Sequence, residues 1–246
     1  MSFLLVIKYE FNTHSTLYCT SSALLGGDKK VFYCHFLHRN VVGYSQSGLV
    51  DGFTMGSAQF VSVGNDADMS IQSFVISGAD LNRVSIQTLD SAGRTVDTFS
   101  WNDWMYETPC WVDNDLNVAT RKFAPGEGVW IQGVAGYTLQ TAGQVNQMDV
   151  EVVLRDGFTA IGNPYPINVA IQDIIVDGAD LNRVSIQTLD NAGRTVDTFS
   201  WNDWMYETPC WVDNDLNVAT RELNPGEGIW VQGVAGYTLR MPAPEL

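Results

Sequence analysis

Apolar and polar residues alternate along several short segments of the chain, and this alternation predicts β-strands. In segment 82–89, Val84 and Ile86 alternate with polar residues, which gives a strand one buried face and one face in water. Segment 95–101 is rich in β-branched and aromatic residues, and a short turn that ends at Gly93 separates the two segments. Because glycine readily takes the positive φ of such a turn, the two segments predict a hairpin.

The rest of this region repeats the pattern of short strands separated by turn residues. We expect further strands at 110–112, 118–122, 128–132 and 137–140, with turns at 113–115 and 125–128. Only segment 71–76, matched by 171–176, has the spacing of a helical turn. About seven short strands in about 100 residues predict an all-β unit that is an antiparallel sandwich or barrel.

A long internal duplication organises the chain. Residues 78–139 align on 178–239 at an offset of 100, and only six of these 62 positions differ: 91, 122, 123, 124, 129 and 131. Further upstream, 51–54 matches 156–159 at an offset of 105. We therefore expect two tandem, nearly duplicated β domains at 43–141 (repeat 1) and 142–246 (repeat 2), preceded by an N-terminal extension or β arm at 1–42.

The first 40 residues differ in composition from the repeats. They hold all three histidines and an apolar run at Phe3–Ile7 that is suited to pairing with a sheet edge, in its own chain or in a neighbour's. No basic residue precedes this run and no small-x-small cleavage site follows it, so no orthodox export signal is recognised. Two interpretations stand: the segment is a β arm, or the true start of the chain lies downstream of Met1.

The charge balance excludes two classes of partner. With 13 Lys and Arg against 28 Asp and Glu, the chain has a formal net charge of −15, which repels nucleic-acid backbones and anionic lipid headgroups. No apolar run approaches the roughly 20 residues of a membrane-spanning helix. We expect neither nucleic-acid binding nor membrane insertion.

The repeats offer few groups for catalysis. No histidine lies beyond residue 38, so Cys110 and Cys210 have no activating base within the repeats and are expected to pack as small apolar residues. A two-carboxylate site at Asp103 and Glu107 is the remaining enzymatic alternative. We expect a protein that is not an enzyme, because duplicated surfaces favour binding or assembly, which gain from valency.

One acidic turn resembles part of a calcium loop. Residues 113–117 and their copy at 213–217 place oxygen ligands at the first, third and fifth positions, namely Asp113, Asp115, Asn117, Asp213, Asp215 and Asn217. The sixth position is Val118 where a calcium loop has glycine, and the twelfth lacks the bidentate glutamate. The alternatives are an Asx-rich turn between strands and a looser Ca²⁺ site; no other cofactor is expected.

All eight tryptophans lie in the repeats, four in each copy. Trp130 sits in a strand-like segment and is expected in the core. A less regular stretch of each repeat carries two further aromatic residues, namely Trp104 and Tyr106 in repeat 1 and Trp204 and Tyr206 in repeat 2. They predict either a platform on which sugar rings stack, or packing in a core or between subunits.

Two cysteines of the N-terminal segment are candidates for a disulfide. Cys19 and Cys34 lie 15 residues apart in a strand-like region, where a bridge would stabilise the fold by roughly 3 kcal/mol in an oxidising compartment. Reduced, buried thiols are the alternative.

Three glycine-rich segments together carry a family resemblance: Val42-Gly43-Tyr44, 157–166 (GFTAIGNPYP) and 225–231 (PGEGIWV). Over residues 41–246 the chain resembles uncharacterised secreted bacterial β-repeat proteins, which typically pair two such units. The resemblance implies an exported, non-enzymatic surface or matrix protein, and it assigns no functional residues.

These patterns lead to a hypothesis with one alternative. We expect a non-catalytic structural protein, bacterial and extracellular or at the cell surface, that associates with itself into an oligomer or filament. The alternative is a bivalent carbohydrate-binding protein that uses Trp104, Tyr106 and their copies to hold a glycan. Exposure of the Trp104 ring discriminates between them, because a sugar platform must face solvent.

Overall fold

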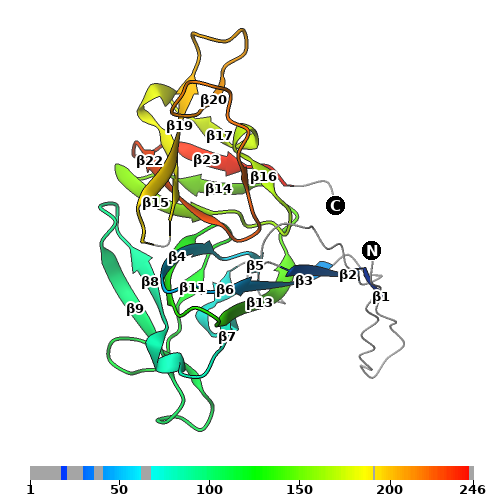
Figure 1. Ribbon diagram of the computed structural model, residues 1–246, viewed down its shortest axis with the longest axis vertical. Coiled ribbons are helices and arrows are strands. Elements are labelled where there is room, and N and C mark those ends of the chain that lie inside the picture. The colour runs from blue at the N-terminus through cyan, green and yellow to red at the C-terminus, as the bar shows by residue number, and fades with distance from the viewer. Residues whose placement is uncertain (1–17, 21–29, 36–40, 62–67, 191, 244–246) are drawn as a thin grey trace.

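The computed structural model describes residues 18–20, 30–35, 41–61, 68–190 and 192–243. The described residues form β-strands joined by turns and four short 3₁₀ helices, without an α-helix, and they build two similar halves (Figure 1). The prediction of an all-β chain with duplicated halves is confirmed. The apolar run Phe3–Ile7 lies outside the described residues.

Repeat 1, together with two strands of the N-terminal segment, contributes two sheets and a two-stranded ribbon, all antiparallel. The first sheet has the order β10 (Cys110–Val112), β9 (Thr95–Asn102), β8 (Ser85–Leu89), β12 (Gly128–Gly133), β4 (Gly52–Ser57). The second has the order β1 (Tyr18–Thr20), β2 (Lys30–His35), β3 (Val41–Gly48), β13 (Thr138–Val145), β5 (Phe60–Val61), with β7 (Val75–Ser77) also on β13. The ribbon pairs β6 (Met69–Ser70) with β11 (Lys122–Phe123).

Repeat 2 builds its first sheet and its ribbon from equivalent residues, and its second sheet has fewer strands. Its first sheet has the order β15 (Gly157–Gly162), β22 (Gly228–Gly233), β18 (Ser185–Leu189), β19 (Thr195–Asn202), β20 (Cys210–Val212). The second has the order β14 (Val150–Val153), β23 (Thr238–Met241), β17 (Ile175–Asp177), and the ribbon pairs β16 (Val169–Ala170) with β21 (Glu222–Leu223). None of the sheets formed by the described strands closes on itself, so each repeat is sandwich-like and the barrel alternative is wrong.

The hairpin predicted around Gly93 is present. Strands β8 and β9 pair through it, and Gly93 has a φ of 75°. The helical turn expected at 71–76 is the 3₁₀ helix Ile71–Ser73, which begins at a Ser70 side chain that accepts a hydrogen bond from the Gln72 amide. Both elements are local, because each needs only contacts within a few residues.

The strand predicted at 118–122 is wrong. Val118 makes a single bridge to Val112, and β11 begins only at Lys122. The Gln72 side chain replaces the missing ladder: its Nε2 lies 2.9 Å from both the Trp111 and Ala119 carbonyl oxygens, and its Oε1 accepts the Trp111 amide. A side chain from a distant element therefore satisfies the backbone groups that the sequence pattern assigned to a strand.

The start of the strand predicted at 82–89 is also wrong. Residues Leu81–Arg83 form a 3₁₀ helix instead, and β8 begins at Ser85. Asp80 causes the difference, since its Oδ1 accepts the Asn82 amide and caps the turn.

Each repeat has its own hydrophobic core, centred on one tryptophan. Trp111 and Trp211 are fully buried, and their indole N–H groups donate to the Phe74 and Ile174 carbonyls at 2.7 and 2.9 Å. Trp101 packs edge-on against Trp111 with ring centroids 5.4 Å apart. Each core is therefore complete without a contribution from the other repeat.

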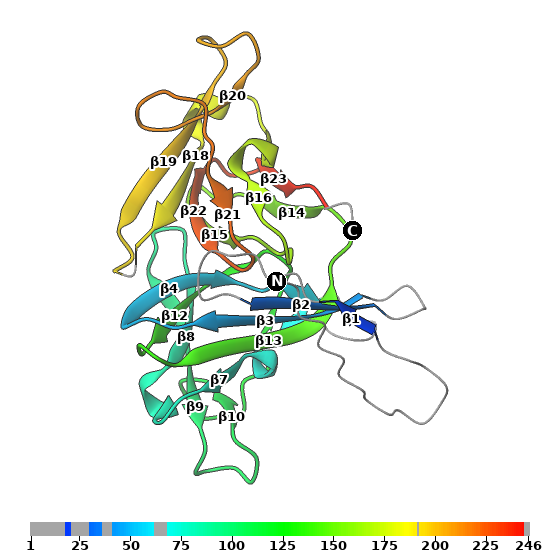
Figure 2. The ribbon, with the colours of Figure 1, turned by 45° about the vertical axis from the view of Figure 1, so that its right-hand side comes forward.

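The two repeats meet through equivalent edges. The edge strands β4 and β15 lie against each other between the halves (Figure 2), and Ser57 Oγ donates to the Asn163 carbonyl across the contact at 2.9 Å. Trp130 packs over Gly193, and Trp230 packs over Gly93 in return. The tryptophan contacts recur with the repeats exchanged, as do the bridges that join Gly56 to Glu227 and Ile161 to Glu127, so the interface has the isologous character of a two-fold dimer. Trp130, expected in a core, is half-buried at this interface.

The repeats differ where one strand is lost. In repeat 1, β5 pairs with the C-terminal end of β13, at Gln144 and Val145. In repeat 2 the equivalent of β13 is β23, which ends at Met241. Pro164 and Pro166 occupy the corresponding stretch of repeat 2, where prolines have no N–H to donate to a ladder. Tyr165 fills the space instead: its hydroxyl lies 2.8 Å from the Met241 carbonyl oxygen and accepts the Val150 amide.

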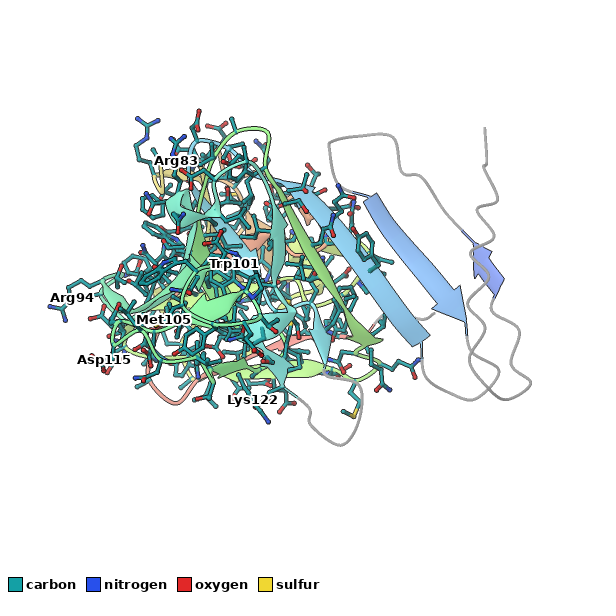
Figure 3. All side chains as sticks on the ribbon, turned by 90° about the horizontal axis from the view of Figure 1, so that it is seen from below. Arg83, Arg94, Trp101, Met105, Asp115 and Lys122 are labelled. Atoms are coloured by element: carbon teal, nitrogen blue, oxygen red, sulfur yellow. The ribbon has the colours of Figure 1, made fainter. Side chains whose placement is uncertain are left out.

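Strands β1 and β2 extend the second sheet of repeat 1 away from the two halves (Figure 3). Their register pairs Cys19 directly with Cys34. Directly opposed residues of antiparallel strands have Cα atoms about 4.5–5.5 Å apart, which a disulfide can span. The disulfide itself stays a prediction. No helix among the described residues is long and apolar enough to cross a membrane.

Candidate functional site

Two loops of each repeat lie at the end of the molecule far from the other repeat. They join β9 to β10 (103–109) and β10 to β11 (113–121), with copies at 203–209 and 213–221. In Figure 1 these loops mark the two extremes of the long axis. We call residues 103–118 and 203–218 the distal ends.

An aspartate closes the second of these loops. Asp113 Oδ1 accepts the backbone N–H groups of Asp115 at 3.0 Å and Asn117 at 2.9 Å, and the Asp113 amide donates to the Asn117 carbonyl. Leu116 at the tip has a φ of 62°, as does Leu216 in the copy. The side chain of Leu116 thus projects from a backbone conformation that residues with a Cβ rarely adopt.

The first loop is fixed from both sides. Asn102 is buried, and its Oδ1 accepts the Met105 amide at 2.9 Å. The Tyr106 hydroxyl donates to the Leu116 carbonyl at 2.8 Å and so ties the first loop to the second. Figure 3 looks onto this end of the molecule, with Met105 and Asp115 at its surface. The two loops therefore form one structured surface.

Apolar side chains project from this surface into solvent. Trp104 is 70% exposed and its copy Trp204 is 72% exposed, so neither ring packs in the core of its own repeat. The other large exposed apolar residues of the distal ends are Met105, Leu116, Val118, Met205, Leu216 and Val218. Tyr106 and Tyr206 are half-buried, and their hydroxyls are engaged as described. The tryptophans, rather than the tyrosines, are the accessible aromatic groups.

Negative charge surrounds the apolar side chains. Between 102 and 120 the chain carries four carboxylates and no Lys, Arg or His. The next basic residue, Arg121, forms an ion pair with Glu127, whose burial raises the pKa of that carboxyl while Arg121 opposes the rise. Asp103 and Glu107 are exposed beside Trp104 in the sequence. The distal end is acidic and aromatic at once.

The geometry of the acidic turn favours an Asx turn over a cation loop. The Oδ1 atoms of Asp113 and Asp213 are already occupied by two backbone N–H groups each. Among the described residues, no group of three or more His, Cys, Asp or Glu side chains is arranged to hold a metal ion. Calcium binding by Asp113, Asp115, Asn117 and their copies stays a prediction.

The cysteines of the repeats are separated by the length of the molecule. Cys110 and Cys210 are half-buried free thiols on β10 and β20. Figure 2 places these strands toward opposite ends, so the two thiols do not meet within one molecule.

Repeat 2 also carries a polar groove that the sequence patterns did not predict. This groove has a volume of about 520 Å³ and is lined by Asn168, Asp197, Phe199, Asp213, Thr220, Arg221, Glu222 and Asn224. A signal was present in the sequence, since 122–124 is the longest run of differences within the aligned residues 78–139. The sequence alone does not show that these positions line a cavity, because the cavity forms only where β21 and β19 come together in the fold.

Comparison with known proteins assigns no relative: no family model, curated protein or solved structure matches the chain.

Proposed function

We propose that this protein is a non-catalytic, bivalent carbohydrate-binding protein, bacterial and extracellular or at the cell surface, that bridges two glycan chains through its distal ends. The observation that carries the proposal is the exposure of Trp104 and Trp204 on structured surfaces at opposite ends of the molecule.

Leaving an indole in water is unfavourable in a folded protein unless a ligand covers it. Burial of one tryptophan ring removes about 150–250 Å² from water, and both repeats place Trp111 and Trp211 in this way. Both also keep Leu116 and Leu216 exposed in a strained conformation, and such strain tends to cluster at ligand sites. An exposed apolar surface held in place at this cost is typical of an interaction site.

The chemistry of the distal end suits a sugar. The flat indole of Trp104 offers a face for the C–H groups of a pyranose ring, and the exposed carboxylates of Asp103 and Glu107 can accept hydrogen bonds from its hydroxyls. A single such site binds weakly. Two sites on one rigid body raise the avidity for a multivalent surface by about 10²–10⁴.

Titration of a glycan library onto the full chain tests this function. We expect two equivalent sites in the native protein and one in Trp104→Ala or Trp204→Ala. The double variant should show none, because the affinity of each altered site should fall roughly tenfold or more. Val96→Ala with Val196→Ala is the matched control, because these valines are 58% and 57% exposed on the hairpins. Glycan binding that survives in W104A/W204A would refute the proposal.

Self-association into filaments is the second candidate function. The observation that favours it is the similarity of the two distal ends. An apolar surface at each end of a long molecule can join copies in an open series. The four carboxylates of each distal end oppose such contacts, since two facing ends would bring eight together.

The two candidates respond differently to salt. Screening of the carboxylates would promote end-to-end assembly, so filaments should appear in electron micrographs at high ionic strength if this function is correct. Their loss in W104A/W204A would assign the contact to the distal ends. A monomer at every salt concentration would reject the second candidate and leave the first unaffected.

A further inference from the structure

The two repeats are joined by a short connection, residues 146–149, between β13 and β14 (Figure 2). Asn146 closes it into a bend, because its Nδ2 donates to the Met148 carbonyl at 3.0 Å and its Oδ1 accepts the Met148 amide at 3.2 Å. The far end of the connection is fixed to repeat 2, since the Asp149 carboxylate accepts the Ala243 amide at 2.8 Å. Opening of this bend would therefore separate the repeats and leave the fold of each intact.

Separated repeats would carry complementary apolar surfaces. Trp130 packs over Gly193 of the other repeat, and Trp230, which is 7% exposed, packs over Gly93 in return. Each repeat keeps its own hydrophobic core, so the surfaces that face each other in the closed molecule would persist after separation. Exposure of the two indoles to water favours a new pairing between repeats.

The edge strands β4 and β15 exclude the pairing of two copies of repeat 1. Ser57 of β4 and Gly162 of β15 occupy equivalent positions and face each other across the contact. A Cβ atom on Gly162 would lie 2.3 Å from Ser57 Cβ. Two copies of repeat 1 would place a serine against a serine at this point, where the contact has no space for a second Cβ atom.

Two copies of repeat 2 would lose contacts that unlike repeats make. Met55 packs so closely against Gly228 that a Cβ atom there would lie 2.1 Å from Met55 Cγ, whereas repeat 2 has Ala160 at the position of Met55. The Ser57 hydroxyl donates to the Asn163 carbonyl at 2.9 Å, and repeat 2 has a glycine at the position of this serine. The contact therefore favours one repeat of each kind.

We propose that this contact is also a docking surface for a second copy of the chain. Repeat 1 of one copy pairs with repeat 2 of the other, and the reciprocal pairing closes a dimer of exchanged repeats. The contacts between repeats are those of the closed monomer, and only the connection at 146–149 changes its path. The dimer presents four distal ends in place of two. This inference does not rest on the function proposed for the distal ends.

The chain concentration decides between the closed monomer and the exchanged dimer. A short connection holds the partner repeat of the same chain at an effective concentration in the millimolar range. A second copy competes when the chain concentration approaches this value, or when the connection folds back less readily. We therefore expect the native chain to form a measurable fraction of dimer at about 1 mM.

Two full-length variants with one blocked surface each test the docking. Ser57→Phe blocks repeat 1 and Gly162→Leu blocks repeat 2, so neither chain closes on itself and each keeps one native surface. Both chains carry W104A/W204A, so that contacts between distal ends do not contribute. Size-exclusion chromatography with light scattering should show a monomer for either variant alone, and a dimer for their equimolar mixture at about 0.1–1 mM.

Near-UV circular dichroism controls for folding, because the fully buried Trp111 and Trp211 report on the two cores. A mixture of folded chains that stays monomeric would overturn the docking between copies. Dimers of either variant alone would overturn the preference for unlike repeats.

The connection gives an independent test in chains whose contact surfaces are native. Asn146→Ala removes both hydrogen bonds of the bend and leaves β4 and β15 unchanged. In the W104A/W204A background, we expect this variant to raise the equilibrium constant for dimer formation about tenfold at about 1 mM chain. A chain that stays monomeric at this concentration, with or without Asn146→Ala, would reject the exchange even if the blocked variants failed to fold.

Discussion

Leu116 and Leu216 each hold a φ of 62° while 46% of their surface is exposed. A left-handed conformation costs a residue with a Cβ roughly 1–2 kcal/mol, and an exposed leucine recovers little of that cost through burial. Asparagine tolerates this conformation better, because its side chain hydrogen-bonds locally. Leucine at these two positions therefore lowers the stability of the fold, which is consistent with a binding role for its exposed side chain.

We predict that Leu116→Asn with Leu216→Asn stabilises the protein by about 0.5–1 kcal/mol per site and raises the melting temperature. The same variant should weaken glycan binding at the distal ends. Thermal unfolding and titration measure the two effects separately. A lower melting temperature would show that the leucine side chains contribute to stability rather than to binding.

Tyr165 makes stability depend on pH in the alkaline range. Burial raises the pKa of its hydroxyl from 10.0 to about 12. Because the folded pKa lies above the unfolded one, the contribution of Tyr165 is fully present below about pH 10 and is lost as the pH rises toward 12. Tyr165→Phe should cost about 1–3 kcal/mol at neutral pH, since the Val150 amide loses its acceptor.

Urea unfolding across this range checks the prediction. The native protein should lose more stability than Tyr165→Phe between about pH 10 and pH 12. Parallel curves would mean that other groups dominate the alkaline transition.

At the scale of elements, the sequence predicts what local contacts determine. The hairpin through Gly93 and the turn at Ile71–Ser73 follow from residues that lie within a few positions of each other. The strand predicted at 118–122 was wrong because the Gln72 side chain, 47 residues before Ala119, donates to the Ala119 carbonyl in place of a neighbouring strand. The exposure of Trp104 could not be predicted, since Trp104 and Trp111 are the same residue type and differ only in tertiary surroundings.

The tie between the two distal loops is a second testable element. Tyr106→Phe removes the hydrogen bond to the Leu116 carbonyl and leaves the core untouched. We expect faster amide hydrogen exchange at 113–118, an unchanged melting temperature within a few degrees, and weaker glycan binding. Tyr206 in the same molecule serves as the internal reference, and equal exchange in both repeats would contradict the proposed tie.

At the scale of the whole molecule, small residues permit the two repeats to approach. A Cβ atom on Gly228 would lie 2.1 Å from Met55 Cγ and 2.8 Å from the Met55 carbonyl carbon. Gly228→Ala should therefore destabilise the pairing of the repeats by about 1–3 kcal/mol and lengthen the molecule in solution scattering.

Gly178→Ala is the matched control for this variant. Its Cβ would meet the Tyr237 ring within repeat 2, so it should lower the melting temperature without changing the separation of the repeats. An unchanged scattering profile for both variants would mean that the interface adapts to the added methyl group.

The reciprocal contact between the repeats also limits how many repeats of one chain can pair through it. Each repeat uses one edge of its first sheet, β4 or β15, for this reciprocal contact, while β10 or β20 forms the opposite edge. A third copy would find β4 and β15 already in contact with each other, so it could not join through the same contact. Growth by further duplication is therefore expected in steps of two, and a valence of two follows from the same closure.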